Sequence, residues 1–77
     1  YYYTNIYVTT KDNKHILAEV ITEIGKKDYL VRSCKTLEKD ANLIYELNIR
    51  IKDKDELEKI KNAIFKMNNV VKVSDNL

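Results

Sequence analysis

The stretch LIYELNIRIKDKDE, residues 43–56, changes from a strict alternation of residue types into the start signal of a helix. Apolar residues stand at every odd position from Leu43 to Ile51, the period of a strand with one buried face. The even positions, beginning with Ile44 and Glu46, are expected to point to the other face. Asp53 and Glu56 then form the spacing of a capping box, in which side chains accept from the first free N–H groups of a helix. The stretch therefore predicts a strand that leads directly into a helix.

Downstream of this junction, apolar residues recur at the spacing of one helical face. They are Leu57, Ile60, Ala63, Ile64 and Met67. Asn68 and Asn69 are expected to end this helix, and the sequence VVKVS, residues 70–74, predicts a short final strand.

Upstream, residues 4–10 predict a first strand, because Ile6 and Val8 alternate with polar and aromatic neighbours. From Asn13 the period becomes helical, with Asp12 or Asn13 as the expected cap and two lysines, residues 26 and 27, at the end. The apolar stripe of this helix is Ile16, Leu17, Val20, Ile21 and Ile24. Residues 28–39 return to a strand composition, and residues 38–42 are predicted to form a hairpin loop.

The predicted order is strand, helix, strand, strand, helix, strand. Two split crossovers on one antiparallel sheet give the ferredoxin-like α+β sandwich, with four strands and both helices on one face. Residues 1–77 are expected to form a single domain. The chain begins at Tyr1 rather than at a methionine, and we interpret it as a domain of a longer protein.

Length and composition narrow the classes of function. A 77-residue chain buries only about 60% of the surface exposed on unfolding, so partner association is an expected source of stability. One cysteine and one histidine make neither an internal disulfide nor a zinc site, and this composition is typical of a reducing, cytoplasmic setting. The formal charge of +2 predicts no strong attraction to nucleic acid or membrane. No apolar run approaches the ~20 residues that cross a bilayer.

No set of catalytic residues, cofactor site or metal site is recognised. His15 is the one imidazole for Ser33 or Cys34, and Cys34 is expected to be an apolar filler at the sheet. Base stacking on the sheet is disfavoured, because Tyr3 and Tyr7 face outward on the first strand but the third strand offers no outward aromatic residue. By itself the domain is predicted not to be an enzyme.

The stretch NIYVTTKDNKHILAEVITEI, residues 5–24, resembles the start of an ACT domain. Within that family it is most similar to the carboxy-terminal ACT domain of the RelA/SpoT-type GTP pyrophosphokinases. The matching positions are Ile6, Val8, Asp12, Lys14, Ile16, Leu17, Ala18, Glu19 and Val20. Residues 43–73 resemble the third strand, second helix and closing V-x-x-V strand of the same domain, here Val70 and Val73.

This resemblance implies a regulatory module of a (p)ppGpp synthetase/hydrolase in the stringent response. It implies a side-by-side homodimer or contacts with other domains of the parent chain, with ribosomal RNA or tRNA as partners through the parent. A small amino acid is a further expected partner, and a membrane is not. Two alternatives stay open: an amino-acid-sensing ACT domain of a biosynthetic enzyme, and a dimerisation module without a ligand.

The resemblance places the candidate ligand site at the first turn. Its residues are Asp12, Asn13, Lys14, His15, Ile16 and Leu17. Asn13 stands where the family usually has arginine, and His15 where it usually has glycine. Because glycine permits close approach of a ligand to the backbone, the larger histidine is expected to fill part of the pocket.

Overall fold

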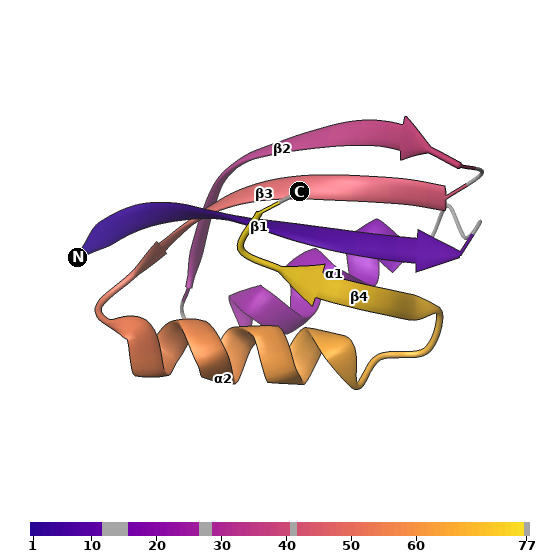
Figure 1. Cartoon of the computed structure of the whole chain (residues 1–77). Helices are drawn as coiled ribbons and strands as arrows, with labels where there is room; N and C mark the ends of the chain where they lie inside the picture. Colours follow the sequence, from indigo (N-terminus) through magenta and orange to yellow (C-terminus); the bar gives the residue numbers. More distant parts are fainter. Residues whose placement is uncertain (12–15, 27–28, 41, 77) are drawn as a thin grey trace.

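A computed structural model describes residues 1–11, 16–26, 29–40 and 42–76 of the chain. The elements are β1 (Tyr2–Lys11), α1 (Ile16–Gly25), β2 (Leu30–Lys39), β3 (Asn42–Ile51), α2 (Lys54–Phe65) and β4 (Val70–Ser74). Figure 1 shows both helices on the same side of one sheet. The predicted ferredoxin-like order is therefore confirmed. In the described part of the chain, no helix is long and apolar enough to cross a membrane.

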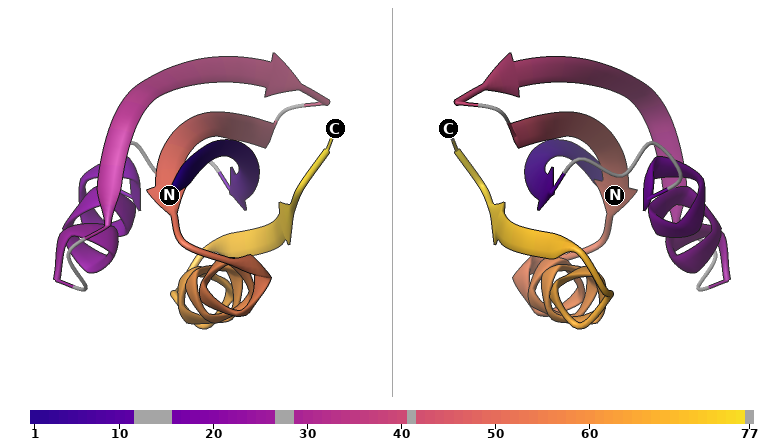
Figure 2. Two further views of the ribbon diagram at one scale, coloured as in Figure 1. Left: turned by 90° about the vertical axis from the view of Figure 1, so that its left-hand side faces the viewer. Right: turned by 90° about the vertical axis from the view of Figure 1, so that its right-hand side faces the viewer.

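The strands lie in the order β2-β3-β1-β4, and every neighbouring pair is antiparallel. β3 and β1 pair over their whole lengths, from Tyr2 opposite Ile51 to Lys11 opposite Asn42. Viewed along the strands, the sheet curves strongly, and β2 arches above β3 and β1 (Figure 2). The two edges differ in length, because β2 has 10 residues and β4 has 5.

The core lies between the helices and the face of the sheet that they cover. Its buried members are Ile6, Val8, Ile16, Val20, Ile24, Tyr45, Leu47, Ile49, Ile51, Leu57, Ile60 and Ile64. The alternation predicted for residues 43–51 is confirmed, since the odd positions from 45 to 51 are buried. Burial of the side chains that line this face is the main favourable term for such a small domain.

Two apolar residues differ in exposure from what their predicted positions imply. Ile21 was predicted in the buried stripe of the first helix, but its side chain is 39% exposed, so the covered face of α1 is narrower than expected. Ile44 was predicted to point outward, and it does lie on the face without helices, yet it is only 7% exposed. Its cross-strand neighbours Thr9 and Leu37 flank it there and exclude most of the water.

The first strand is longer and the hairpin tighter than predicted, whereas β2 begins two residues later than the predicted range 28–39. β1 begins at Tyr2 rather than at residue 4, and strand pairing continues up to Lys39 opposite Asn42, within the predicted loop. Asp40, in the connection, has a φ of 50°, the left-handed conformation that a short aspartate tolerates in tight turns. Pairing up to this turn extends the exposed surface of the sheet toward the hairpin tip.

The capping box before α2 is confirmed with one difference. Asp53 Oδ1 accepts from the Glu56 N–H at 2.9 Å, as predicted. Glu56 Oε2 accepts in return from the N–H of Lys52, one residue before the cap, at 2.8 Å. After the helix, Asn69 adopts a φ of 69° and turns the chain into β4. The predicted start signal is therefore confirmed. The predicted stop is too late, because α2 ends at Phe65 with Lys66 as its C-cap, and Met67, expected in the helical stripe, packs against the core from the turn that follows.

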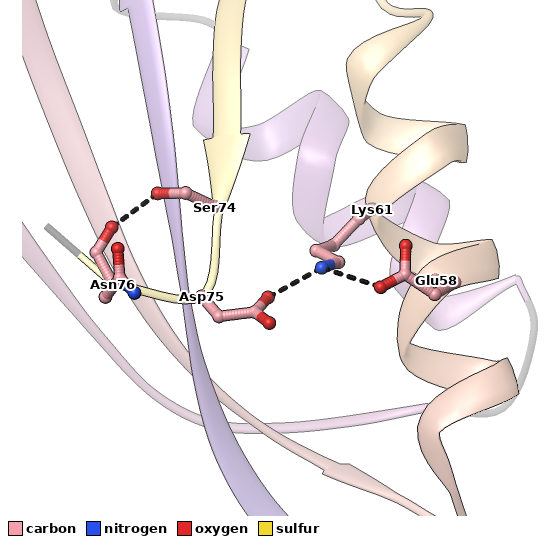
Figure 3. Close-up of polar contacts among 5 residues, drawn as sticks. All are labelled: Glu58, Lys61, Ser74, Asp75 and Asn76. Carbon is pink, nitrogen blue, oxygen red and sulfur yellow. Dashed lines mark hydrogen bonds and ion pairs between the residues drawn. The ribbon is translucent and has the colours of Figure 1, made fainter.

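Lys61 ties the end of β4 to α2 (Figure 3). Its Nζ lies 2.8 Å from Asp75 Oδ1 and 2.9 Å from Glu58 Oε1, and its side chain is 16% exposed. These hydrogen bonds, first to Asp75 and then to Glu58, raise the pKa of the Lys61 ammonium above its usual 10.5. These two ion pairs hold the C-terminal end of β4 against α2.

We expect Lys61→Met to lower the free energy of unfolding by about 0.5–1 kcal/mol at pH 8, since the pair is partly exposed. A raised pKa favours the charged form in the folded state, so its contribution is complete below pH 10.5 and disappears as the pH rises through the folded-state value. Chemical denaturation across pH 8–11 measures this difference. Lys59→Met, at an exposed position of the same helix, is the control. A constant difference at high pH would contradict the ion-pair interpretation.

Candidate functional site

The predicted ligand turn joins β1 to α1, and most of it lies outside the described residues. Asp12, Asn13, Lys14 and His15 belong to that undescribed part. Ile16 is fully buried and begins α1 within the core, whereas Leu17 is half-buried and packs against the core. The two apolar residues of the site are thus next to each other at the helix start, and the ligand role of all six residues stays a prediction.

The last two residues of β1, which lead into this turn, are bonded to neighbouring segments. Thr10 is fully buried and donates from Oγ1 to the carbonyl of Leu43 at 3.3 Å. The Lys11 N–H donates to the carbonyl of Asn69 at 3.0 Å, which joins β1 to the turn before β4. The end of β1 is therefore held on one side by β3 and on the other by the turn before β4.

The described residues contain no group of three or more His, Cys, Asp or Glu side chains that could hold a metal ion. Cys34 is exposed, so its predicted role as a buried filler is wrong: β2 is an edge strand on which most side chains are exposed. Desolvation nevertheless raises the pKa of the Cys34 thiol, which disfavours the reactive thiolate. This cysteine has none of the surroundings of an activated nucleophile.

The face of the sheet opposite the helices, here called the open face, has a defined composition because the strand register is known. Its residues are Leu30, Ser33, Lys35, Leu37 and Lys39 of β2; Asn42, Ile44, Glu46, Asn48 and Arg50 of β3; Tyr3, Asn5, Tyr7, Thr9 and Lys11 of β1; and Lys72 and Ser74 of β4. Near its middle, Asn48 Nδ2 donates to Asn5 Oδ1 at 2.7 Å. The open face is therefore polar, with one buried apolar position at Ile44.

Two tyrosines at the start of β1 stack against basic side chains. The Arg32 guanidinium carbon lies 3.9 Å from the centroid of the Tyr3 ring, which places Arg32 over the open face as well. The guanidinium carbon of Arg50 lies 4.8 Å from the centroid of the Tyr1 ring. Such contacts hold a guanidinium flat while its N–H groups at the edge still point outward.

The open face has a net positive charge and carries half of the basic residues of the described chain. Its basic residues are Lys11, Arg32, Lys35, Lys39, Arg50 and Lys72, and its acidic residue is Glu46. Elsewhere in the described chain, acidic residues outnumber basic ones by nine to six. The formal charge of +2 had predicted no strong attraction to polyanions. The net charge does not reveal how the charges are distributed, and the fold separates charges that nearly cancel in the composition.

A hollow of about 170 Å³ lies on the open face near the hairpin tip. Its lining residues include two lysines, Lys39 and Lys72, one carboxylate, Asp40, and the apolar Ile44. Tyr7, Thr9 and Ser74 bring hydroxyl groups, and Asn42 and Asn76 bring amides. Residues from the hairpin tip and from the segment after β4 both line it. The hollow is rich in hydrogen-bond donors, which suits an anionic group.

A second hollow, of about 290 Å³, lies between α2 and β4. Phe65 and Val71 line it, with exposed fractions of 56% and 45%, beside the ion pair of Lys61 and Glu58. Sequence reasoning missed both hollows, because each requires the positions of neighbouring strands. The signal for the first was present in the basic residues at alternate outward positions of the strands.

Comparison with known proteins gives a consistent family assignment. Residues 1–74 match the ACT domain family. The ACT domain from the GTP pyrophosphokinase of Chlorobium tepidum has a TM-score of 0.78 at 22% identity, with 95% of each chain covered. The C-terminal domain of the MgtC protein from Mycobacterium tuberculosis has a TM-score of 0.73 at 16% identity, with 94% of this chain and 81% of that domain covered.

A homoserine dehydrogenase from Thiobacillus denitrificans contains the same fold, with a TM-score of 0.69 at 12% identity over 95% of this chain and 17% of the enzyme. None of the curated proteins matches the chain. Identities this low show a shared fold, whereas the family match covers nearly the whole sequence. The chain belongs to the ACT domain family, whose members are regulatory rather than catalytic.

Proposed function

We propose that this ACT domain is the regulatory module of a GTP pyrophosphokinase and controls (p)ppGpp synthesis or hydrolysis in the cytoplasm. The observation that supports this role is the similarity to the ACT domain of the Chlorobium tepidum enzyme, which covers 95% of both chains. The RelA/SpoT-like sequence of residues 5–24 and the closing strand add to it. The domain supplies no chemistry of its own, so its control acts by shifting populations of states in the parent enzyme.

The proposed partners are other domains of the parent, ribosomal RNA or tRNA reached through the parent, and a second copy of this domain. The long edge strand β2 is the site that we propose for the second copy. Edge strands present unpaired N–H and C=O groups, and β2 has twice as many residues as the other edge strand, β4. Pairing through β2 would continue the sheet across both copies.

A second candidate function is amino-acid sensing, as in a biosynthetic enzyme. The occurrence of this fold within a homoserine dehydrogenase favours it. The ligand would bind at Asp12, Asn13, Lys14 and His15, where the free N–H groups at the start of α1 would receive a carboxylate. His15 in place of glycine argues against a full pocket. This candidate therefore stands second.

Deletion of residues 1–77 from the full-length parent tests the first function. We expect purified truncated enzyme to keep its catalytic rate, because the domain contributes no catalytic group. In cells, the change in (p)ppGpp level on amino-acid starvation should be altered, as measured by nucleotide chromatography. An unchanged starvation response, with the truncated protein present at normal amount, would rule out the regulatory role.

Titration with the common amino acids tests the second function. We expect no amide shifts for residues 10–17 of the native domain at millimolar concentrations, because the histidine ring occupies space that glycine would leave open. His15→Gly is the matched variant, and it should show shifts if the rest of the pocket is intact. Saturable shifts in the native domain would instead support the sensing function. Heteronuclear NMR gives both measurements.

Sedimentation at several concentrations tests the proposed dimer. We expect a reversible monomer–dimer equilibrium, with amide hydrogen exchange slowed at alternate residues of β2 in the dimer. Alternation is expected because only every second N–H of an edge strand points away from its own sheet. A strict monomer at high concentration, or protection confined to β4, would contradict pairing through β2.

A further inference from the structure

Because the charges are separated, the open face is strongly basic, unlike the rest of the described molecule. Six basic residues and Glu46 lie on its strands, Asp40 lines the hollow near the hairpin tip, and the rest of the described chain is net acidic. The ion pairs of the described residues belong to Lys26 and Lys61, both outside this face. The basic side chains of the open face are thus not neutralised by ion pairs within the described chain, and they favour a polyanionic partner.

The negative charge of Glu46, on β3, is partly offset by the positive charge of a lysine on the neighbouring strand. Glu46 lies directly opposite Lys35 in the pairing of β2 with β3. Opposite charges at such positions attract each other, so Glu46 subtracts little from the field of the remaining cations. These cations extend from Arg50 and Arg32 at one end to Lys39 and Lys72 at the other. Along β1, this distance is about 27 Å at 3.4 Å per residue.

The aromatic rings of the open face favour a nucleic acid over an acidic peptide as the polyanionic partner. An acidic peptide needs only cations, whereas a nucleic acid also offers flat bases. Tyr3 is 41% exposed on this face, with Arg32 stacked on its ring, and Tyr7 lies four residues further along the same face. Rings and guanidinium planes are the groups on which unpaired bases stack, beside cations that follow the backbone.

The hollow near the hairpin tip completes this pattern. Lys39, Lys72, Tyr7 and Thr9 are among its lining residues, and Asp40 is the one carboxylate there. Ammonium and hydroxyl groups around a donor-rich depression are suited to a phosphate and its sugar. Both ends of the open face therefore offer contacts to the same kind of chain.

From these observations we infer that the open face binds single-stranded nucleic acid. Arg32, Lys35, Lys39, Arg50 and Lys72 contact phosphates, and Tyr3 stacks with a base. The third strand still lacks an outward aromatic residue, as the sequence indicated, so stacking is confined to β1 and its arginine partners. The inference rests on the proposed function in that it assigns a surface to the proposed RNA partner, and its evidence is this chain's own charges and register.

Fluorescence anisotropy with a labelled ten-nucleotide uridine RNA tests the inference on the 77-residue chain. We expect saturable binding that weakens with salt, with a slope of about −0.7 per phosphate contact in a log–log plot. Lys35→Glu with Lys72→Glu should weaken binding by about tenfold or more and make that slope less steep. Tyr3→Leu should weaken binding by about tenfold without changing the slope, since stacking involves no counterion release.

The matched control is Lys59→Glu with Lys66→Glu, at exposed positions of α2 and just after it. It changes the net charge by the same amount on the opposite side of the sheet, so it should leave binding nearly unchanged. Circular dichroism of each variant establishes that the fold is kept, and the Tyr3 and Lys variants act through different contacts.

The inference would be overturned if the chain did not bind the RNA at low salt, or if the open-face and control variants lost equal affinity. It would also be overturned if a duplex, or a glutamate decapeptide, bound as tightly as the single-stranded RNA. Self-association that is abolished by the Lys35 and Lys72 changes, without RNA binding, would make a second copy the occupant. None of these results bears on the starvation response of the parent, so this inference and the proposed function fail separately.

Discussion

The pairing of β3 with its two neighbours is the constraint on which the rest of the structure depends. β3 pairs along β1 over its whole length and along β2 from Leu30 opposite Arg50 to Lys39 opposite Asn42. A slip of one residue would move Leu47 and its alternate neighbours from the core to the open face. The apolar stripes of the two helices are therefore useful only in this register. Both the core and the open face follow from it.

The same register explains why charge is separated. Carboxylates are concentrated on and around the helices, where Asp53 and Glu56 accept from free N–H groups at the start of α2. Acidic residues in a first helical turn are also favoured by the helix dipole. On the strands, the outward positions are occupied mainly by neutral polar and basic residues. Local preferences for helix starts and strands thus produce a molecule with two electrically different sides.

The elements that could be predicted are those whose signals are local. The alternation of β3, the capping box at Asp53 and the turn at Asn69 each depend on a few neighbouring residues. The exposure of Ile21 and Cys34 depends instead on which distant element covers them, and no local pattern contains that information. The basic open face required the register of four strands. The ligand role of the first turn stays a prediction, because residues 12–15 lie outside the described chain.

The open face and the proposed dimer edge are physically linked, because both involve β2. If two copies pair through this strand, Lys35 and Lys39 of each copy lie on one continuous face close to the seam. Like charges brought together at a seam oppose pairing. A polyanion lying across the seam would remove this repulsion, so its binding and the pairing of the domains would strengthen each other by the same coupling free energy. Lysines on an edge strand oppose its pairing with a second copy. In this domain they would then allow β2 to pair with a second copy only when an anion is bound.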